Sequence, residues 1–196
     1  MAPESLEDLL DAMEPEVGDA AVSVRDILER IGDRSFSPAI LIPALLLVSP
    51  LSGIPGTPTL GAFIIILIAL QGAAGRKHLW LPRFLMRRSV SSVRMLRAVD
   101  FLERPAKWVD GYTEGRRLIF LTVGPLRILA LLMIAVVAAT WPFLELLPMV
   151  TSIGAGCVSL IAFGLMTRDG VFVLAGYALL ALFYGAGFGM IAEWMA

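Results

Sequence analysis

Long apolar runs alternate with short polar connections along most of this chain. Five apolar segments stand out after residue 35, and we expect each of them to be helical. They run from about Phe36 to Leu51, Thr59 to Gly75, Leu118 to Trp141, Met149 to Met166, and Gly170 to Ile191. Because about 20 residues (range 17–25) cross the hydrocarbon of a bilayer, the last three segments are long enough, or nearly so, to span it.

The first two segments are a short, interrupted pair. The first contains Pro38 and Pro43, and the two are joined by the stretch SPLSGIPGTPTLG, which carries Pro50, Pro55 and Pro58. Proline removes an amide donor and glycine weakens a helix, so this stretch cannot be continuous helix. It is either an exposed turn or irregular backbone at the edge of the bilayer, as in re-entrant or broken helices.

Two polar regions flank this pair. Residues 1–35 form the first region; its first twenty residues carry seven carboxylates, and no Lys or Arg precedes residue 25. Helical apolar spacing occurs at Leu6, Leu9, Leu10 and Met13 and again at Val24, Ile27, Leu28 and Ile31. We expect amphipathic helices that lie on the membrane or on the rest of the protein. Residues 76–117 hold eleven of the sixteen Lys and Arg. On one face of a helix there we place the apolar residues Leu81, Leu85, Val93, Leu96 and Val99.

This charge distribution predicts the topology. The positive-inside rule places residues 76–117 in the cytoplasm, where the arginines lie near anionic head groups. The amino terminus is then inside and the carboxyl terminus outside. The sequence therefore divides into residues 1–35 (acidic, amphipathic), 36–75 (short or re-entrant pair), 76–117 (basic, cytoplasmic) and 118–196 (three transmembrane helices). The predicted fold class is an all-α polytopic membrane protein.

Composition supports a membrane protein and argues against an enzyme. Hydrophobic residues make up 58% of the 196 residues, above the roughly 45–50% of soluble domains. The chain has one cysteine, Cys157, and one histidine, His78. These exclude a disulfide framework and a multi-histidine metal cluster. Motifs of the GxSxG, P-loop and HExxH types are absent. We expect no catalytic activity, cofactor, metal ion or nucleic-acid partner.

An internal repeat is suggested by a shift of 92 residues. Gly32 then falls on Gly124, Pro50 on Pro142, Gly72 on Gly164 and Arg76 on Arg168. Internal duplication is common in transporters, whose sites lie between the repeats. Chance coincidence in a chain rich in glycine and proline is the alternative.

A few polar residues within or beside the apolar segments are candidates for substrate binding. They are Arg34, Gln71, Arg76, Arg127, Glu145, Arg168 and Asp169. Arg127 lies about ten residues into the third segment, after a proline, Pro125, that would kink the helix. It either reaches lipid head groups or faces the interior and binds an anion. Glu145, between Pro142 and Pro148, could be a surface carboxylate, Gln71 could hydrogen-bond between helices, and Arg168 and Asp169 could form only a turn.

Small residues recur every four positions on the last segment, at Ala181, Gly185 and Gly189. Such a stripe allows close helix packing, either within the subunit or across a dimer. Because the chain is small for a transporter, we expect a homodimer.

Several stretches together resemble the ExoD family of bacterial exopolysaccharide-synthesis proteins. They are GDRSFSPAIL, SPLSGIPGTP, LQGAAGRKHLWLP, FLERP and MTRDGVFVLAG, in this order over nearly the whole chain. The family pattern corresponds here to Gly32 and Arg34, the three prolines of the first turn, Gln71 and Gly75, Trp80 to Pro82, and Arg168 to Gly170. The resemblance implies an inner-membrane protein needed for exopolysaccharide production, with a link to alkali tolerance, but it supplies no biochemical activity.

Three functions follow from these observations. The first is a transporter-like component of exopolysaccharide synthesis or export that handles an anionic or lipid-linked intermediate, because discontinuous helices and arginines could meet phosphate. The second is a non-transporting scaffold for a polysaccharide synthase. The third is an ion or proton antiporter, for which the sequence offers no acidic residue deep in a helix.

Overall fold

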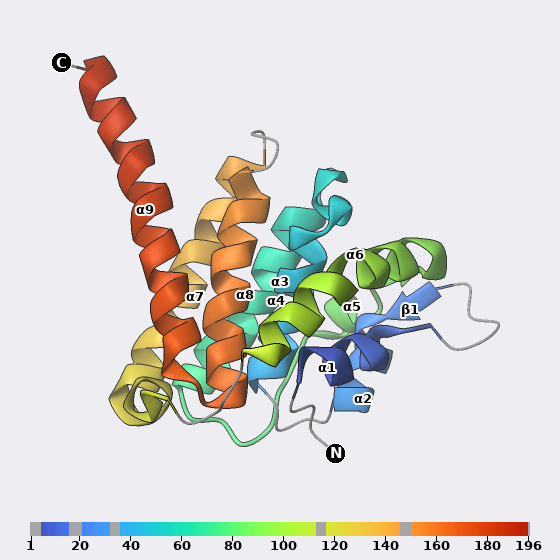
Figure 1. Cartoon of the computed structure of the whole chain (residues 1–196). Helices are drawn as coiled ribbons and strands as arrows, with labels where there is room; N and C mark the ends of the chain where they lie inside the picture. Colours follow the sequence, from blue (N-terminus) through green and yellow to red (C-terminus); the bar gives the residue numbers. More distant parts are fainter. Residues whose placement is uncertain (1–4, 16–20, 32–35, 113–116, 146–149, 196) are drawn as a thin grey trace.

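The computed structural model describes residues 5–15, 21–31, 36–112, 117–145 and 150–195, and for residues 31, 50, 51, 150 and 186–195 it describes the backbone alone. Figure 1 shows an almost entirely helical molecule. In chain order the elements are α1 (Leu6–Met13), β1 (Ala21–Ser23), α2 (Val24–Ile31), α3 (Phe36–Val48), η1 (Pro50–Gly53), α4 (Thr57–Ala73), α5 (Arg83–Met86), β2 (Ser89–Ser91), α6 (Ser92–Gly111), η2 (Ile119–Thr122), α7 (Gly124–Leu144), α8 (Val150–Thr167) and α9 (Gly170–Met195).

Each of the five apolar segments contains one long helix, namely α3, α4, α7, α8 and α9. The third segment differs in its start. Leu118 takes a left-handed conformation (φ 47°), a 3-10 turn follows, and the α-helix begins only at Gly124. In the part of the chain that the structure describes, α7 is the helix that is both long and apolar enough to cross a membrane. In the other four helices, the stretches whose side chains the structure describes have 10–17 residues.

Two helical hairpins make up most of the bundle. The hairpin α3–α4 turns at η1, and the hairpin α7–α8 turns after Glu145, at the same end of the molecule (Figure 1). Helix α4 packs along α7 and α3 packs along α8, while α9 packs against α8. Figure 1 shows α9 projecting beyond the other helices at its carboxyl end.

The amino-terminal helices pack on the protein itself. Ser5 and Asp8 form a capping box at the start of α1, and the Asp110 carboxylate of α6 accepts hydrogen bonds from the amides of Leu6 and Glu7. These bonds fix the start of α1 to the end of α6, because the first amides of a helix have no partner inside it. The apolar face of α1 is buried, as its spacing predicts, by Leu6, Leu9, Leu10 and Met13.

A short two-stranded sheet joins the two polar regions of the chain. Strand β1 pairs antiparallel with β2, with Ala21 opposite Ser91, Val22 opposite Val90 and Ser23 opposite Ser89. The hydrophobic pattern does not predict these strands, because three residues are too few to show an alternation.

Helix α6 is amphipathic, but its buried face is not the one predicted. Leu81, Leu85 and Val99 are buried, whereas Val93 and Leu96 are exposed. The buried face of α6 consists of Met95, Ala98, Val99, Leu102 and Ala106. The prediction that Val93 and Leu96 share it is therefore wrong. The loop and short helix between Leu81 and Val93 change the helical phase, so one period cannot run through the whole region.

Candidate functional site

Glu145 joins the two proline-rich turns. Its carboxylate accepts hydrogen bonds from the backbone amide of Gly56 and from the hydroxyl of Thr59, at the start of α4. Gly56 has a left-handed backbone (φ 85°) that favours glycine and supplies no capping side chain of its own. Glu145 therefore caps α4 from the neighbouring hairpin.

The environment of Glu145 favours its charged form. The hydroxyl of Thr59 and then the amide of Gly56 lower the pKa of the Glu145 carboxyl below its ordinary value, because both donate to the carboxylate. A second link at this end is the 2.9 Å hydrogen bond between the hydroxyls of Ser52 and Ser152. Both carboxylate oxygens of Glu145 thus bind the protein's own chain, so substrate binding by Glu145 stays a prediction.

The prolines of these turns occupy different environments. Pro50 begins η1, Pro55 is exposed, and Pro58 is buried in the first turn of α4, where its missing amide is harmless. Pro142 is exposed in the last turn of α7, and Pro148 lies outside the described residues. The turn from Pro50 to Pro58 therefore leads directly into α4, and its Gly56 amide is bonded to Glu145.

The opposite end of the bundle is built around the turn between α8 and α9. Arg168 is exposed with a left-handed backbone (φ 57°), and the amide of Gly170 donates a 2.7 Å hydrogen bond to the carbonyl of Arg117. A Cβ atom at Gly170 would lie 2.3 Å from the carbonyl oxygen of Leu118. Glycine is therefore required where the chain entering η2 crosses this turn.

Asp169 is fully buried in that turn. One carboxylate oxygen accepts a 3.0 Å hydrogen bond from the amide of Val171 and caps α9, while Oδ2 has no hydrogen-bond partner among the described residues. The sequence does not reveal this burial, because Arg-Asp-Gly reads as an exposed turn. Asp169 thus has a structural role at the start of α9.

Arg127 lies in the first turn of α7, and its side chain is half-buried. The predicted depth of ten residues within the helix is wrong, because the helix begins only at Gly124. The predicted kink at Pro125 is wrong for the same reason: proline at the first or second position of a helix removes no internal hydrogen bond. Arg34 lies outside the described residues.

Gln71 holds the backbone of the next loop. Its side-chain amide donates a 2.7 Å hydrogen bond to the carbonyl of Trp80 and accepts a 2.9 Å hydrogen bond from the Trp80 amide. It also donates to the carbonyl of Leu67 within α4. The partner of Gln71 is therefore a loop backbone and not another apolar helix. The prediction that Gln71 forms a hydrogen bond between helices is wrong. Arg76 follows in this loop and is exposed.

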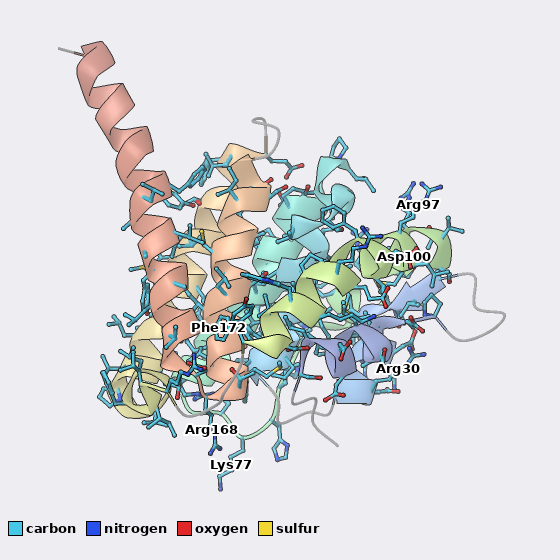
Figure 2. The ribbon with its side chains drawn as sticks, viewed as in Figure 1. Arg30, Lys77, Arg97, Asp100, Arg168 and Phe172 are labelled. Atoms are coloured by element: carbon cyan, nitrogen blue, oxygen red, sulfur yellow. The ribbon has the colours of Figure 1, made fainter. Side chains whose placement is uncertain are left out.

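The candidate residues do not form a single site. Arg127 and Glu145 are 18 residues apart on one helix, which corresponds to about 27 Å along its axis. Figure 2 shows Lys77, the neighbour of Arg76, at the same end as Arg168. The arginines 76, 127 and 168 therefore belong to one end, and the proline-rich turns with Glu145 belong to the other.

The small-residue stripe on α9 faces outward where the structure describes it. Ala181 and Gly185 are exposed, and a Cβ atom at Gly185 would meet nothing within 4 Å. The surroundings of Gly189 are not described. Close packing of α8 and α9 depends on other glycines: a Cβ at Gly176 would lie 2.5 Å from Ile161, and one at Gly164 would lie 2.7 Å from the Asp169 carbonyl oxygen. Sequence spacing alone missed both.

A large apolar cavity of about 1250 Å³ lies between α6 and the bundle. We call it the α6–α8 groove. Helix α6 supplies one wall with Phe101 and Pro105, α8 supplies Gly156 and Cys157, and α9 supplies Leu182. Its polar atoms include the hydroxyls of Thr140 and Tyr184, which bind each other at 2.9 Å. Sequence patterns could not predict it, because it depends on how α6 lies across the bundle.

Among the described residues, no three or more His, Cys, Asp and Glu side chains lie close enough to hold a metal ion. The site offers instead a basic end, a closed polar end, and an apolar groove between α6 and the bundle.

The fold defines a helical protein in which amphipathic helices pack beside a bundle of apolar helices. The family model "Exopolysaccharide synthesis, ExoD" matches residues 6–188 and associates this protein with exopolysaccharide synthesis. The chain belongs to the ExoD family, as its sequence motifs predict. It is 28% identical over 175 residues to Protein ExoD of Rhizobium meliloti (strain 1021), covering 88% of this chain and 72% of the relative. No solved structure matches significantly.

Proposed function

We propose that this protein is a multi-pass inner-membrane component of exopolysaccharide synthesis or export, and that it handles an anionic or lipid-linked intermediate. Membership of the ExoD family supports the link to exopolysaccharide. We further propose that it acts as a transporter-like protein and not as an enzyme.

The observation that carries this proposal is the outward face of α7. This face presents Leu129, Leu132, Val136 and Phe143 with 41–81% of their surface exposed. Helix α9 adds Val171, Leu174, Leu179 and Leu182. Soluble monomers rarely expose contiguous apolar patches larger than a few hundred Å², whereas a lipid bilayer covers such faces without cost. These faces therefore support insertion of the bundle in a membrane.

The arrangement of the hairpins supports an internal repeat. Under the 92-residue shift α3 corresponds to α7 and α4 corresponds to α8. The contact between α4 and α7 therefore has an equivalent in the contact between α8 and α3. Both pairs are closely packed, as an internal symmetry would require. We propose that the two hairpins are related halves that run in the same direction. We further propose that the substrate site lies between these halves and the neighbouring helices.

The basic end supports the anionic character of the intermediate. Arg127 is half-buried beside the start of α7, where the amides of the first turn carry partial positive charge. Arg76 and Arg168 lie exposed at the same end. A guanidinium at a helix start, with two further cations at the same end of the bundle, suits a phosphate-bearing head group.

Substitution of Arg127 tests this function. Arg127→Ala should abolish exopolysaccharide production in a complemented deletion strain while the protein level in membranes stays normal, and Arg127→Lys should give an intermediate phenotype, because lysine lacks the forked donor geometry. Arg25→Ala is the matched control, since Arg25 is an exposed arginine of α2 paired with Glu29. Normal polysaccharide from a well-expressed Arg127→Ala protein would remove the anion site and favour the scaffold alternative.

Reporter fusions test the topology. We propose that the amino terminus and residues 76–117 are cytoplasmic, with anionic lipids at the basic segment, and that the carboxyl terminus is periplasmic. A cytoplasmic reporter signal after residue 196 would show that the number of crossings is even, and the α3–α4 hairpin would be the first to re-examine.

The exposed stripe on α9 supports a homodimer. Gly185→Leu should weaken dimerisation in mild detergent, whereas Ala139→Leu, at an exposed position of α7, should not. A stable monomer in both detergent and lipid would contradict the dimer.

A further inference from the structure

Asp169 is a buried carboxylate without a positive partner in the described part of the chain. Its side chain is fully buried, and oxygen Oδ1 accepts a 3.0 Å hydrogen bond from the amide of Val171. Oxygen Oδ2 is also buried and has no hydrogen-bond partner, and Asp169 forms no salt bridge with another described residue. A buried charge is costly unless an opposite charge pairs with it or it binds a metal ion. The burial of Asp169 therefore calls for a positive charge beside Oδ2.

The backbone around Asp169 is held in uncommon conformations. Among the described residues, Leu118 and Arg168 are the non-glycine residues with positive φ, at 47° and 57°. Arg168 directly precedes Asp169, and Leu118 belongs to the segment that crosses the same turn. Left-handed backbone is costly for residues with a side chain, and it is concentrated at functional sites, where the surrounding structure enforces it. Both of these conformations therefore occur at one crossing of the chain.

Main-chain carbonyl groups lie against this crossing. Helix α8 ends at Thr167, and the carbonyl oxygens of its last turn have no partner inside the helix. The carbonyl oxygen of Gly164 is one of them, and it accepts a 3.0 Å hydrogen bond from the Asp169 amide. The carbonyl oxygen of Leu118 would lie 2.3 Å from a Cβ atom at Gly170. In transporters, helix carboxyl ends and unwound backbone of this kind coordinate sodium ions.

The number of carboxylates indicates a monovalent ion. Among the described residues no three His, Cys, Asp or Glu side chains lie close enough to hold a metal ion. Asp169 is thus a single negative charge, and the other oxygen atoms at the crossing are neutral carbonyls. One positive charge balances it, whereas a divalent ion would leave a buried excess of charge. The neighbouring Arg168 is exposed, so its guanidinium group lies in water.

We infer that Oδ2 of Asp169 binds a sodium ion, together with main-chain carbonyl oxygens where the chain before η2 crosses the α8–α9 turn. The ion holds this chain against the start of α9. Arg127 follows η2 in the first turn of α7, so the ion fixes the start of the helix that carries Arg127. This inference rests on the proposed function, and it adds sodium as a coupling ion at the basic end.

Binding of radioactive sodium by the full-length protein in detergent tests the site. A scintillation proximity assay in choline chloride should show one saturable site from which unlabelled sodium chloride displaces the label. Asp169→Asn should lower the affinity by about tenfold or more, because an amide carries no charge to balance the ion. Asp110→Asn is the matched control, since the Asp110 carboxylate also caps a helix start, that of α1. It should bind sodium as the unmodified protein does.

Thermal unfolding gives a second measurement. Sodium chloride, at about 100 times the dissociation constant of sodium, should raise the melting temperature of the unmodified protein by about 5–10 °C over choline chloride of equal ionic strength. Asp169→Asn should melt at the same temperature in both salts. Asp169→Ser is a second variant in case the first does not fold, because serine and asparagine both cap helix starts well.

The possible outcomes separate the sodium site from the proposed function. Absence of saturable sodium binding by the unmodified protein, or equal binding by Asp169→Asn and Asp169→Ser, would overturn the site. Stability that changes with pH but not with sodium would overturn it in favour of a bound proton. No sodium binding combined with loss of polysaccharide in Arg127→Ala would leave the proposed function standing. Sodium binding that depends on Asp169, combined with normal polysaccharide in Arg127→Ala, would do the reverse.

Discussion

Helices α3 and α7 are both strongly apolar, yet they lie in different surroundings. Helix α3 packs against α4 and α8 and is covered by α1 and α2, so Leu41 is fully buried. Helix α7 packs against α4 and α8 on one side and exposes residues such as Leu132 on the other. A helix that is apolar all round gives no periodic signal of which face is covered. The cover on α3 comes from amphipathic segments distant in sequence.

The two hairpins also differ at positions that correspond under the 92-residue shift. A Cβ atom at Gly72 of α4 would lie 3.2 Å from a side-chain carbon of Leu131. At the corresponding Gly164 of α8 it would lie 2.7–2.8 Å from backbone atoms of Asp169 and Val173. A side chain can move aside, whereas backbone cannot do so without shifting the start of α9. Similar sequence positions therefore carry different constraints.

The largest expected effect concerns burial in α3 and α7. Leu41→Ala should lower the free energy of unfolding by about 2–5 kcal/mol, because it leaves a cavity in a fully buried position. Leu132→Ala, at a position 41% exposed, should cost less than about 1 kcal/mol. Thermal unfolding of both variants in one detergent measures the difference. Similar losses would mean that α7 is covered in the native assembly, for example by a second copy.

The glycine pair should give the next largest effect. Gly164→Ala should cost about 1–3 kcal/mol through overpacking against backbone. Gly72→Ala should be close to neutral, because alanine favours helix by up to about 1 kcal/mol and offsets a small side-chain adjustment. The yield of folded protein by size-exclusion chromatography and its melting temperature report both. A tolerated Gly164→Ala would show that α8 and α9 can separate slightly without loss.

Much of the helical framework could be predicted from the sequence, and the placement of polar residues could not. Long apolar runs and the spacing of Leu6 to Met13 suffice for helices, because each signal lies within one segment. The capping of α4 by Glu145 and the contact of Gln71 with Trp80 join residues separated by a turn or a hairpin. Nothing local in the sequence indicates such partners. The same holds for the burial of Asp169, which depends on the chain before η2 crossing the turn.

The smallest expected effect concerns the start of α4, which is capped by Glu145 from the other hairpin. Glu145→Gln should lower the free energy of unfolding at pH 7 by about 1 kcal/mol, because an amide accepts the bonds from Gly56 and Thr59 less strongly than a carboxylate. The lowered pKa of Glu145 sets the pH dependence. Its contribution is complete above the ordinary value of 4.5 and is lost as the pH falls through the lower pKa of the folded protein. The melting temperatures of the variant and of the unmodified protein should therefore converge in acid.

Asp11→Asn, at an exposed carboxylate of α1, is the control for removing one negative charge. A difference that persists unchanged below the folded pKa would show that the shape of the side chain matters and not its charge.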